Sequence, residues 1–435
     1  MTGFLVLFVY IAIFAIAFLI VYYIIGGLIK ASGYESLKTV TFGDESSVKP
    51  NRIASVVSVI TLFALWGAFT GSSILPSFLH APGPFLGDTS FSYTLEDPDG
   101  NRDDASVLVR VHSFGETVED PVSDASDDGF AKNDTFKAVA FRSTLLKIDG
   151  NDDVTTSDGA RIVAIEGQPV ELTSEGKPAA GQRIEVPNGE IRFSSRGTPN
   201  FEPRSGLQME SVWLPAPEKV FQRFLSVASE GYQDSSLLEH LYFSLYRVVM
   251  GFIAGALVGI PLGYAMGLSG WFRGWFDPIV EFMRPVPPLA LIPLVIIWAG
   301  IGESGKIILL FLAALWIMTI AARAGVSGVN ITKVHAAYSL GASKWQILRH
   351  VIIPNSLPEI FTGARVAMGV CWGTVVAAEL VAAEVGAGMM IMVASRFQLT
   401  DIVIMGIILI GVIGYLIDIL FRMAENWLVP WKGRS

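Results

Sequence analysis

The stretch HAAYSLGASKWQILRHVIIPNSLPE, residues 335–359, is polar and broken by glycine, yet it lies between two long apolar runs. It carries four basic or imidazole side chains, His335, Lys344, Arg349 and His350. Connections between neighbouring helices are commonly only about 2–8 residues long. A segment of this length and pattern therefore indicates more than a simple link between two membrane spans.

The same stretch has the pattern of two short helices joined by a turn. Residues 332–340 favour a helix, and Gly341 is placed to end it, because glycine readily adopts the left-handed conformation that follows a helix. Ser343 has Gln346 three residues later, which is the capping-box spacing of a helix start. We expect a helix–turn–helix elbow on the inner face of the membrane. The plainer alternative is a structured loop that merely joins two spans.

The end of the stretch carries two further signals. Pro354 is expected to interrupt the second short helix, since proline lacks the N–H that a helix interior needs. Ser356 with Glu359 repeats the capping-box spacing and predicts the start of the next span.

Composition places the chain among helical membrane proteins. It has 435 residues, of which 51% are hydrophobic and 16% charged, and its mean hydropathy is +0.51. Its first apolar run lacks the basic flank and cleavage site of a signal peptide and is expected to be retained. We predict an all-α polytopic membrane protein with about seven transmembrane helices. The predicted spans are residues 4–29, 53–75, 241–267, 285–300, 306–323, 359–382 and 402–422.

Basic residues in the short loops predict the orientation, because lysine and arginine are enriched in cytoplasmic loops. They occur in residues 30–52, 268–284 and 324–358 and in the C-terminal tail. Seven spans place these four segments on one side of the membrane. The elbow is therefore expected in the cytoplasm, and the N-terminus on the outer side.

A regular glycine stripe marks the span at 241–267. Glycines recur there every four residues, so they fall on one face of a helix and let a second helix approach closely. Pro261 in the same span is expected to kink it. The glycines are Gly251, Gly255, Gly259, Gly263 and Gly267.

Residues 76–212 differ in composition from the rest of the chain. Between 80 and 212 there are 24 acidic and 12 basic residues, a net charge of −12, whereas the whole chain has −9. Turn-forming clusters such as EDPDGNRDD separate β-branched runs such as SVLVRVHSF. We predict an inserted small, mostly-β extracytoplasmic domain with solvated acidic turns, because no cluster has the spacing of a calcium-binding loop. The chain has no basic patch that would favour a nucleic-acid partner.

No motif predicts catalysis or a metal site. GIGESGKI, residues 300–307, approaches a nucleotide-binding P-loop, but Ile307 stands where a serine or threonine would hold magnesium. Cys371 is the single cysteine, and the five histidines lack the spacing of metal ligands. We expect no catalytic residue and no bound metal, and any ATP must be bound by another chain.

The elbow resembles the EAA loop of ABC-importer permeases, which reads Glu-Ala-Ala, three residues, Gly, nine residues and Ile-x-Leu-Pro. In that family the loop is a coupling helix that docks into a groove of the ATP-binding subunit. The resemblance implies this role for residues 333–357, with Ser343 and Trp345 among them. With a histidine where the family usually has Glu, the matching positions are His335, Ala336, Ala337, Gly341, Val351, Ile353 and Pro354.

The resemblance covers about half of the chain, from WLPAPEKVF at 213–221 to the C-terminus. FMRPVPPLALIPLVIIWAGIGESGKI (282–307) and VVAAELVAA (375–383) are similar to permeases that import nitrate, taurine, alkanesulfonates or bicarbonate. A five-to-six-helix importer permease core is expected. The implied parts are an extra N-terminal helix with a cytoplasmic linker (1–52), a span (53–75), the periplasmic insert (76–212) and the permease domain (213–435).

The resemblance implies a multi-pass permease subunit of an ATP-driven importer in the bacterial inner membrane, moving a small anionic solute. The implied partners are ATP-binding subunits that hold ATP and magnesium, a periplasmic solute-binding protein, a second identical permease and membrane lipid. This chain itself is expected to bind no cofactor. Charges inside spans are candidates for the solute path, with a structural ion pair or snorkelling as the alternative. The candidate path residues are Arg247, Arg365, Glu379 and Trp298.

Two other classes of protein compete with this interpretation. A membrane sensor or scaffold with a ligand- or partner-binding periplasmic domain would explain the insert, but it would not explain the elbow. A secondary transporter needs no ATPase, yet its usual inverted repeats are not evident in the sequence.

Overall fold

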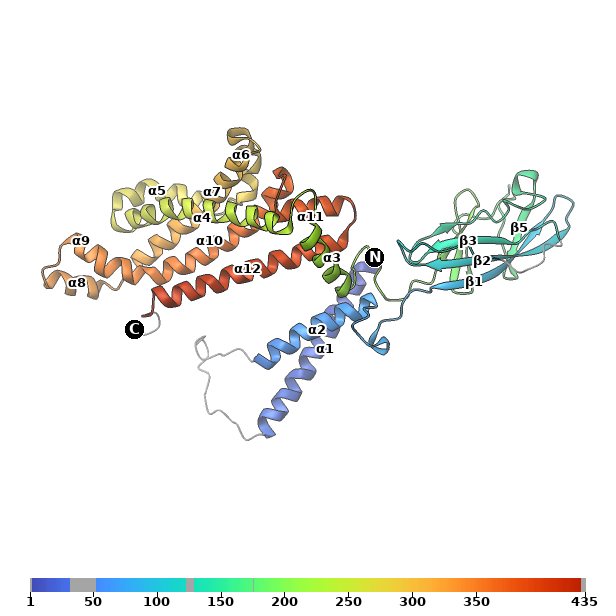
Figure 1. The fold of residues 1–435 in the computed structure, drawn as a ribbon, viewed down its shortest axis with the longest axis horizontal. Coiled ribbons are helices and arrows are strands. Elements are labelled where there is room, and N and C mark those ends of the chain that lie inside the picture. The colour runs from blue at the N-terminus through green and yellow to red at the C-terminus, as the bar shows by residue number, and fades with distance from the viewer. Residues whose placement is uncertain (1, 32–51, 123–128, 175, 432–435) are drawn as a thin grey trace. The chain divides into compact units, whose positions relative to one another are not determined.

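The computed structural model describes residues 2–31, 52–122, 129–174 and 176–431 (Figure 1). The chain divides into two compact units, Met1–Glu218 and Lys219–Ser435, each described here by itself. Part of the predicted cytoplasmic linker and of the basic tail lies outside the described residues, including Lys38, Lys49, Lys432 and Arg434.

Two apolar helices begin the first unit. α1 covers Thr2–Ala31 and corresponds to the span predicted at 4–29. α2 covers Arg52–Thr70, so the helix predicted at 53–75 is shorter than expected. It ends there because Gly71 adopts a left-handed backbone with φ +62°. At 19 residues, α2 is close to the minimum length that spans a bilayer.

The predicted mostly-β region is a sandwich of two sheets. One sheet has the strand order β3-β2-β1-β5-β6 and the other β4-β9-β8-β7. β2 and β3 pair in parallel, and the other pairs are antiparallel. The strands are β1 Gly87–Glu96, β2 Arg102–His112, β3 Asp134–Val139, β4 Thr144–Leu145, β5 Arg161–Ile165, β6 Gln168–Pro169, β7 Arg183–Val186, β8 Gly189–Phe193 and β9 Pro199–Pro203, with short 3-10 turns at Ser77–Leu79 and Thr156–Asp158.

Strand alternation builds the core of the sandwich. Successive side chains of a strand point to opposite faces, and β1 buries every second residue. Phe91 from β1 stacks on Phe201 from β9, with ring centroids 6.2 Å apart, which joins the two sheets. One contiguous cluster of buried apolar residues therefore holds the domain together.

The carboxylate of Asp152 is buried at the edge of this core. Asp152 is 8% exposed and accepts hydrogen bonds from the Lys132 N–H at 2.6 Å and from the Tyr93 hydroxyl at 3.1 Å. Burial raises the pKa of the Asp152 carboxyl above its ordinary value of 3.8. Burial, with the nearby Asp152 carboxylate, also raises the pKa of the Tyr93 phenol.

The raised pKa of Asp152 predicts how the domain responds to pH. The folded state binds the proton of this carboxyl more tightly than the unfolded state, so its contribution to stability is full below about pH 4 and falls as the pH rises through the raised pKa. Asp152→Asn removes this titration. We expect the variant to gain stability relative to the wild type between about pH 4 and 7.

Hydrogen exchange of β1 peptides in the full chain measures this difference. Asp88→Asn is the control, because the hydrogen bond from Arg110 lowers the pKa of Asp88. The contribution of Asp88 to stability therefore changes below about pH 4, and the difference between this variant and the wild type should stay constant over the range tested. A difference between Asp152→Asn and the wild type that stays constant over this pH range would contradict the assignment.

The second unit is helical. Among the described residues, four helices are long and apolar enough to cross a membrane: α4, α7, α10 with its preceding turns, and α12. They match the spans predicted at 241–267, 306–323, 359–382 and 402–422. The helices are α3 Pro217–Glu230, which begins in the last residues of the first unit, α4 Leu237–Leu268, α5 Gly270–Met283, η4 Pro288–Leu291, α6 Ile292–Ala299, α7 Glu303–Ser327, α8 Ile331–Ser339, α9 Lys344–Ile347, the π segment η5 Leu348–Ile352, α10 Ile353–Ala382, α11 Ala387–Arg396 and α12 Thr400–Leu428.

α4 and α7 pack in parallel along the glycine stripe. A Cβ placed on Gly255 would lie 2.6 Å from the Ala314 Cβ, and one on Gly267 would lie 2.7 Å from the Val326 Cβ. The contacts advance in the same direction along both helices. The predicted close approach is confirmed, and its partner is α7. α4 continues through Pro261.

Parallel packing requires the chain to return across the bundle between α4 and α7. The return is made by α5 and by η4 with α6, two helical pieces that are bent by 93°. The single span predicted at 285–300 is therefore wrong. The sequence RPVPP places three prolines at this point, each without an N–H for a helix interior, and α6 begins only at Ile292.

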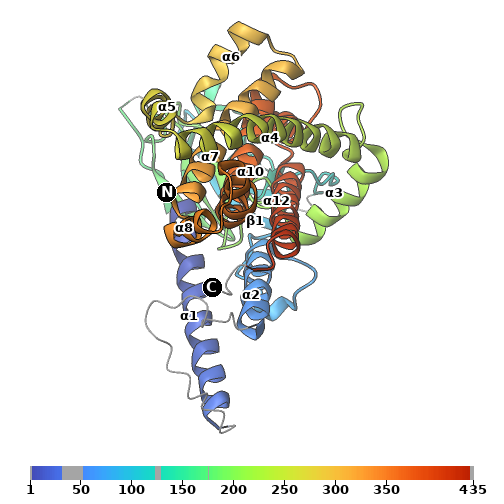
Figure 2. The same ribbon diagram turned by 90° about the vertical axis from the view of Figure 1, so that its left-hand side faces the viewer.

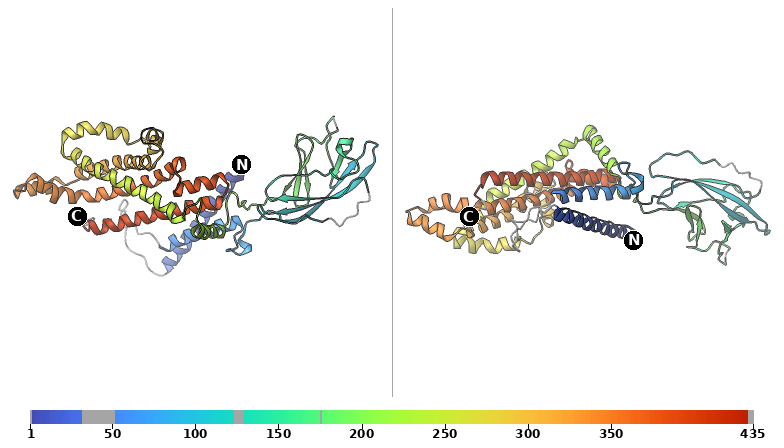
Figure 3. Two further views of the ribbon diagram at one scale, coloured as in Figure 1. Left: turned by 45° about the horizontal axis from the view of Figure 1, so that its top comes forward. Right: turned by 90° about the horizontal axis from the view of Figure 1, so that it is seen from below.

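α10 runs antiparallel to its neighbours and fixes the two ends of the bundle. Its Arg365 pairs with Asp418 of α12 at 2.9 Å, and its Trp372 donates to the Ile410 carbonyl at 3.0 Å. α8 and α9 lie at one end of the bundle and α11 at the other (Figure 1). Figure 2 looks along the bundle from the end that carries α8. Figure 3 shows this arrangement from two further sides. The predicted loop at 383–401 thus contains a helix, α11.

The glycine contact can be tested by adding one methyl group. Gly255→Ala puts a Cβ within 2.8 Å of the Phe311 carbonyl oxygen and should destabilise the chain by about 1–3 kcal/mol. Gly411→Ala in α12 is the matched control, because nothing lies within 4 Å of its added Cβ. That variant should be neutral or more stable by up to about 1 kcal/mol.

The measurement is the midpoint of thermal unfolding in detergent, followed by tryptophan fluorescence. Equal shifts for the two variants would show that the glycine stripe does not hold α4 against α7.

Candidate functional site

The elbow between α7 and α10 has one predicted cap, at Ser343, and one that was not predicted, at Asn330. The Asn330 side chain accepts from the Thr332 N–H at 2.8 Å and starts α8. Gly341 follows α8 with φ +79°. Ser343 and Gln346 form the predicted capping box at the start of α9, at 2.8 and 3.4 Å. The helix–turn–helix is therefore confirmed, and each of its two helices has a side-chain cap at its start.

The prediction that Pro354 interrupts the second short helix of the elbow is wrong. The π segment η5 connects α9 to α10, and Pro354 occupies the first turn of α10. A π turn shifts each hydrogen bond by one residue, which accommodates a residue without an N–H. The Trp431 indole then donates to the Pro354 carbonyl at 3.3 Å. The stretch from Lys344 to Val381 is consequently one continuous helix of 38 residues.

The second predicted capping box is also wrong. Ser356 lies inside the continuous helix and is fully buried, and its hydroxyl donates to the Ile353 carbonyl at 2.9 Å. It also shares a hydrogen bond with the Tyr264 hydroxyl of α4. On its other side the Ser356 backbone comes so close to Gly325 of α7 that a Cβ there would lie 2.9 Å from the Ser356 carbonyl oxygen. Ser356 therefore joins α10 to α4 and α7 just above the elbow.

The elbow presents an apolar tip with basic surroundings. Leu340 is 88% exposed and Trp345 is 65% exposed, while Ile347 beneath them is buried and anchors α9. Residues 331–350 contain no aspartate or glutamate. The predicted coupling residues lie on α8, the turn, α9, the π segment η5 and the first turn of α10: His335, Ala336, Ala337, Gly341, Ser343, Trp345, Val351, Ile353 and Pro354.

Arg247 is at the opposite end of the bundle and is 1% exposed. Its Nε and Nη2 donate to Glu303 at 2.6 and 2.7 Å. Its Nη1 donates to Glu379 at 2.6 Å and to the Val385 carbonyl at 2.8 Å. Lys306 adds a second cation at 2.9 Å from Glu303. Two cations and two carboxylates thus join α4, α7 and α10, in the ion-pair arrangement that was the alternative to a path-lining role.

Glu379 is satisfied by neutral donors as well. It accepts from the Ser244 hydroxyl at 2.8 Å and from the Gly388 N–H at 2.9 Å. Gly386 leaves the space for this carboxylate, because a Cβ there would lie 2.5 Å from the Glu379 Cδ. A buried charge needs such complete pairing.

His240 fastens the same turn to α4. Its Nδ1 accepts from the Gly386 N–H at 3.1 Å, and its Nε2 N–H donates to the Tyr232 carbonyl at 2.9 Å. One ring nitrogen accepts and the other donates, which is the neutral imidazole. No local sequence pattern predicted His240, Ser244, Glu303 or Lys306 at this site, because they come from separate segments.

The other two candidate path residues lie elsewhere. Arg365 faces Asp418, which also pairs with Arg422 at 2.7 Å. These side chains are about a third to two thirds exposed on the α10–α12 face. Trp298, on α6, is 69% exposed. Arg247 and Glu379 are brought together by the fold, whereas Arg365 and Trp298 are placed apart from them.

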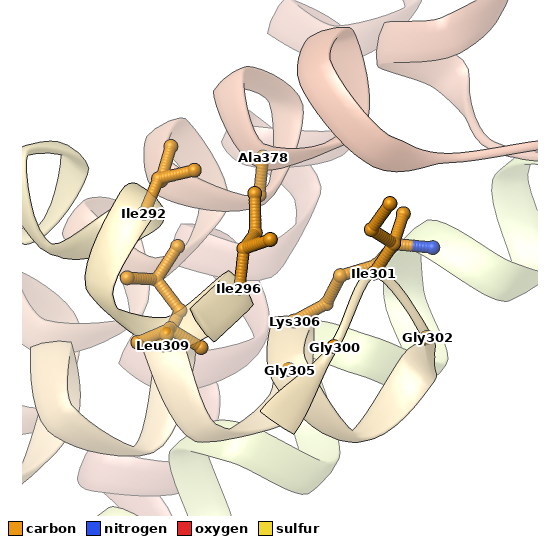
Figure 4. Close-up of a pocket in the computed structure, with 10 residues that line it drawn as sticks. Ile292, Ile296, Gly300, Ile301, Gly302, Gly305, Lys306, Leu309 and Ala378 are labelled. Atoms are coloured by element: carbon orange, nitrogen blue, oxygen red, sulfur yellow. The ribbon is translucent and has the colours of Figure 1, made fainter. Parts of the chain in front are cut away.

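A small cavity lies beside Lys306 and the turn at 300–302 (Figure 4). It is lined mostly by apolar residues of α6 and α7 and has a volume of about 20 Å³. This is room for about one water molecule, not for a solute. The segment resembling a P-loop is therefore a turn between two helices, α6 and α7, and no strand precedes it.

Loss of Arg247 should leave a buried charge unpaired. Arg247→Met removes the cation of Glu379 and should destabilise the chain by about 3–5 kcal/mol. Adding Glu379→Gln should recover part of this loss, because glutamine still accepts from Ser244 without a charge. Arg396→Met, at an exposed arginine with no ion pair among the described residues, should change stability by less than about 0.5 kcal/mol.

Thermal unfolding of the detergent-solubilised variants gives the comparison. If Arg247→Met were as stable as Arg396→Met, the buried cluster would not stabilise this end of the bundle.

The second unit matches known proteins. The family model described as "Binding-protein-dependent transport system inner membrane component" matches residues 255–429. The taurine transport system permease protein TauC of Escherichia coli (strain K12) is 47% identical over 223 residues, which are 51% of this chain and 81% of TauC.

Two further relatives show the same extent of similarity. The putative aliphatic sulfonates transport permease protein SsuC of Escherichia coli (strain K12) is 39% identical over 50% of this chain and 82% of its own length. The nitrate import permease protein NrtB of Synechocystis sp. is 32% identical over 50% of this chain and 81% of its own. Among solved structures, the inward-facing MetNI methionine ABC transporter matches with a TM-score of 0.40 and 19% identity, over 44% of this chain and 95% of that one.

Proposed function

Because this chain belongs to the family of binding-protein-dependent transport system inner membrane components, as an ABC-importer permease of the nitrate, taurine and sulfonate type, we propose that it carries inward a small solute with an anionic group. Taurine or another sulfonate is the first candidate, since the relative named for taurine transport is 47% identical. ATP and magnesium are held by a separate ATP-binding subunit, a solute-binding protein delivers the anion, and two copies of this chain enclose the path in the inner membrane.

The elbow is the observation that carries this proposal. Leu340 and Trp345 form an exposed apolar tip that no other described residue covers, and the elbow is stiffened by two caps and by Gly341. Large exposed apolar side chains with polar surroundings mark protein interaction sites. Basic residues without an acidic neighbour on the elbow favour an acidic groove on the partner.

The continuous helix from Lys344 to Val381 would carry the movement. One end of it lies in the elbow, and Ser356 ties it to α4 and α7. Its other end holds Glu379 in the Arg247 cluster. When ATP draws two partner subunits together, displacement of the elbow would shift this helix as a rigid body and change access at the far end.

The α10–α12 face is the best candidate for the solute path. Arg365, Asp418 and Arg422 place three charges, net positive, on a partly exposed face of two spans. Charges in spans face protein or water-filled space rather than lipid. A second copy of the chain across this face would complete the path, and the excess cation suits an anion. Arg247 and Glu379 then act by holding the outer end together.

Substitutions at the tip test the proposal. Leu340→Asp combined with Trp345→Ala should abolish co-purification of an ATP-binding subunit with the tagged chain and abolish uptake of labelled taurine, because the docking surface becomes charged and loses its anchor. Leu238→Ala is the matched control, since Leu238 is 79% exposed and begins α4 at the other end of the bundle.

The control should retain both the subunit and uptake. Retention of the ATP-binding subunit by the double variant would refute docking at the elbow. The double variant could also retain the ATP-binding subunit with unchanged ATPase activity and yet take up no sulfonate or nitrate. In that case docking must occur at another surface, and the proposed solute would be rejected.

A further inference from the structure

The β-sandwich of the first unit has a cleft that the transport proposal does not use. Its volume is about 430 Å³, within the range of small-molecule sites. Both sheets contribute to it, because its lining comes from residues 146–149 after β4, from the residues before and in β5, from the turn before β7, and from the β8–β9 turn with the first residue of β9. Buried core residues such as Ile148 and Ile162 form part of its floor.

Four basic side chains come to this cleft from four separate segments: Lys147, Arg161, Lys177 and Arg196. This is unexpected in a segment with net charge −12, where carboxylates are abundant. Seven other basic residues of the domain each form an ion pair: Arg102, Arg110, Lys132, Lys137, Arg142, Arg183 and Arg192.

Three of the cleft cations have no such pair. Within residues 52–122, 129–174 and 176–431, no carboxylate forms an ion pair with Lys147, Arg161 or Arg196. The carboxylate of Asp149 also lines the cleft, but it accepts from the Thr156 N–H at 3.1 Å and from the Thr156 hydroxyl at 2.5 Å. Among the described residues, the charges of Lys147, Arg161 and Arg196 are therefore left for a ligand.

Two glycines let the walls of the cleft close around these cations. Gly176 has φ +76°, and a Cβ on it would lie 2.9 Å from the Arg161 Nε, so only glycine leaves room for this guanidinium. Gly197 has φ +79°, and a Cβ on it would lie 3.1 Å from the Pro178 Cδ of the facing turn. The two turns can approach because neither residue carries a side chain.

We propose that this cleft binds a small oxyanion, such as the sulfonate group of an organic solute, sulfate or phosphate, through Arg161, Arg196 and Lys147. A guanidinium offers two parallel N–H donors to such a group, and charge-assisted hydrogen bonds are the strong ones. The surrounding acidic surface repels large polyanions, so the site selects a compact ligand. This anion site is separate from the solute path and goes beyond the proposed transport function.

Titration of the purified full chain tests the site. Taurine, sulfate and phosphate are added in turn at constant ionic strength, and binding is measured by isothermal titration calorimetry. We expect saturable binding of at least one of the three anions, and their order identifies the preferred head group. Arg161→Gln with Arg196→Gln should weaken this binding about tenfold or more.

Arg204→Gln is the matched control. Arg204 belongs to the same domain and has no ion pair among the described residues, but it does not line the cleft. It should bind as the wild type does. Lys147→Gln is tested as a single variant. Hydrogen exchange of β1 is measured in each variant, which distinguishes a variant that has lost ligand binding from one that has lost its fold.

Two results would overturn the inference. One is the absence of saturable binding of all three anions by the wild type. The other is unchanged binding by the folded double variant, above all if the same binding is lost in Arg365→Gln. That outcome would place the anion in the transmembrane path, so it would support the transport proposal while rejecting the cleft.

Discussion

Close contact between α4 and α7 is the constraint on which the second unit depends. In a membrane, helices are not driven together by the hydrophobic effect, so a stripe of glycines that brings two backbones together gains its stability from packing. Here the stripe meets α7 in parallel. Because α4 and α7 are consecutive long helices, parallel packing obliges the chain between them to cross back, and the Pro-rich bend between α5 and α6 lies in that return.

The two ends of the helix bundle have different surfaces. One end of the bundle has the elbow, with an exposed apolar tip and no carboxylate. The other end has Arg247, Glu303, Glu379 and Lys306 in a neutralised cluster. α10 connects the two ends, with Ser356 packed near the elbow and Glu379 inside the cluster. A force applied at the elbow therefore acts on a stiff element whose far end is fastened by charge.

Local patterns could be predicted from the sequence where one short stretch carried all the information. The glycine spacing, the end of α8 at Gly341 and the cap at Ser343 needed only neighbouring residues. Pro354 and Ser356 were wrongly assigned because the π segment and the contacts of Ser356 with α4 and α7 come from packing. The bend at 284–287 was not predicted, because the apolar run at 285–300 is long enough for a span. Its length was given more weight than the three prolines in RPVPP.

The partners of the charged residues could not be predicted in this way. Arg247 was visible as a costly intramembrane charge, but its carboxylates lie 56 and 132 positions away in the sequence. In the β-sandwich, turn clusters and alternation predicted strands, yet the parallel pairing of β2 with β3 and the basic cleft depend on which strands meet. The ion-pair partners of Arg247 and the pairing of the strands both depend on tertiary contacts.

Thiol labelling of membrane vesicles tests the central claim, that the segment between α4 and α7 crosses the membrane. The native Cys371 is fully buried, so its background reaction is small. Gly270→Cys precedes the return and Ser304→Cys follows it. The account predicts that an impermeant reagent labels Ser304→Cys only in right-side-out vesicles and Gly270→Cys only in inside-out vesicles. Labelling of both positions from the same side would contradict it.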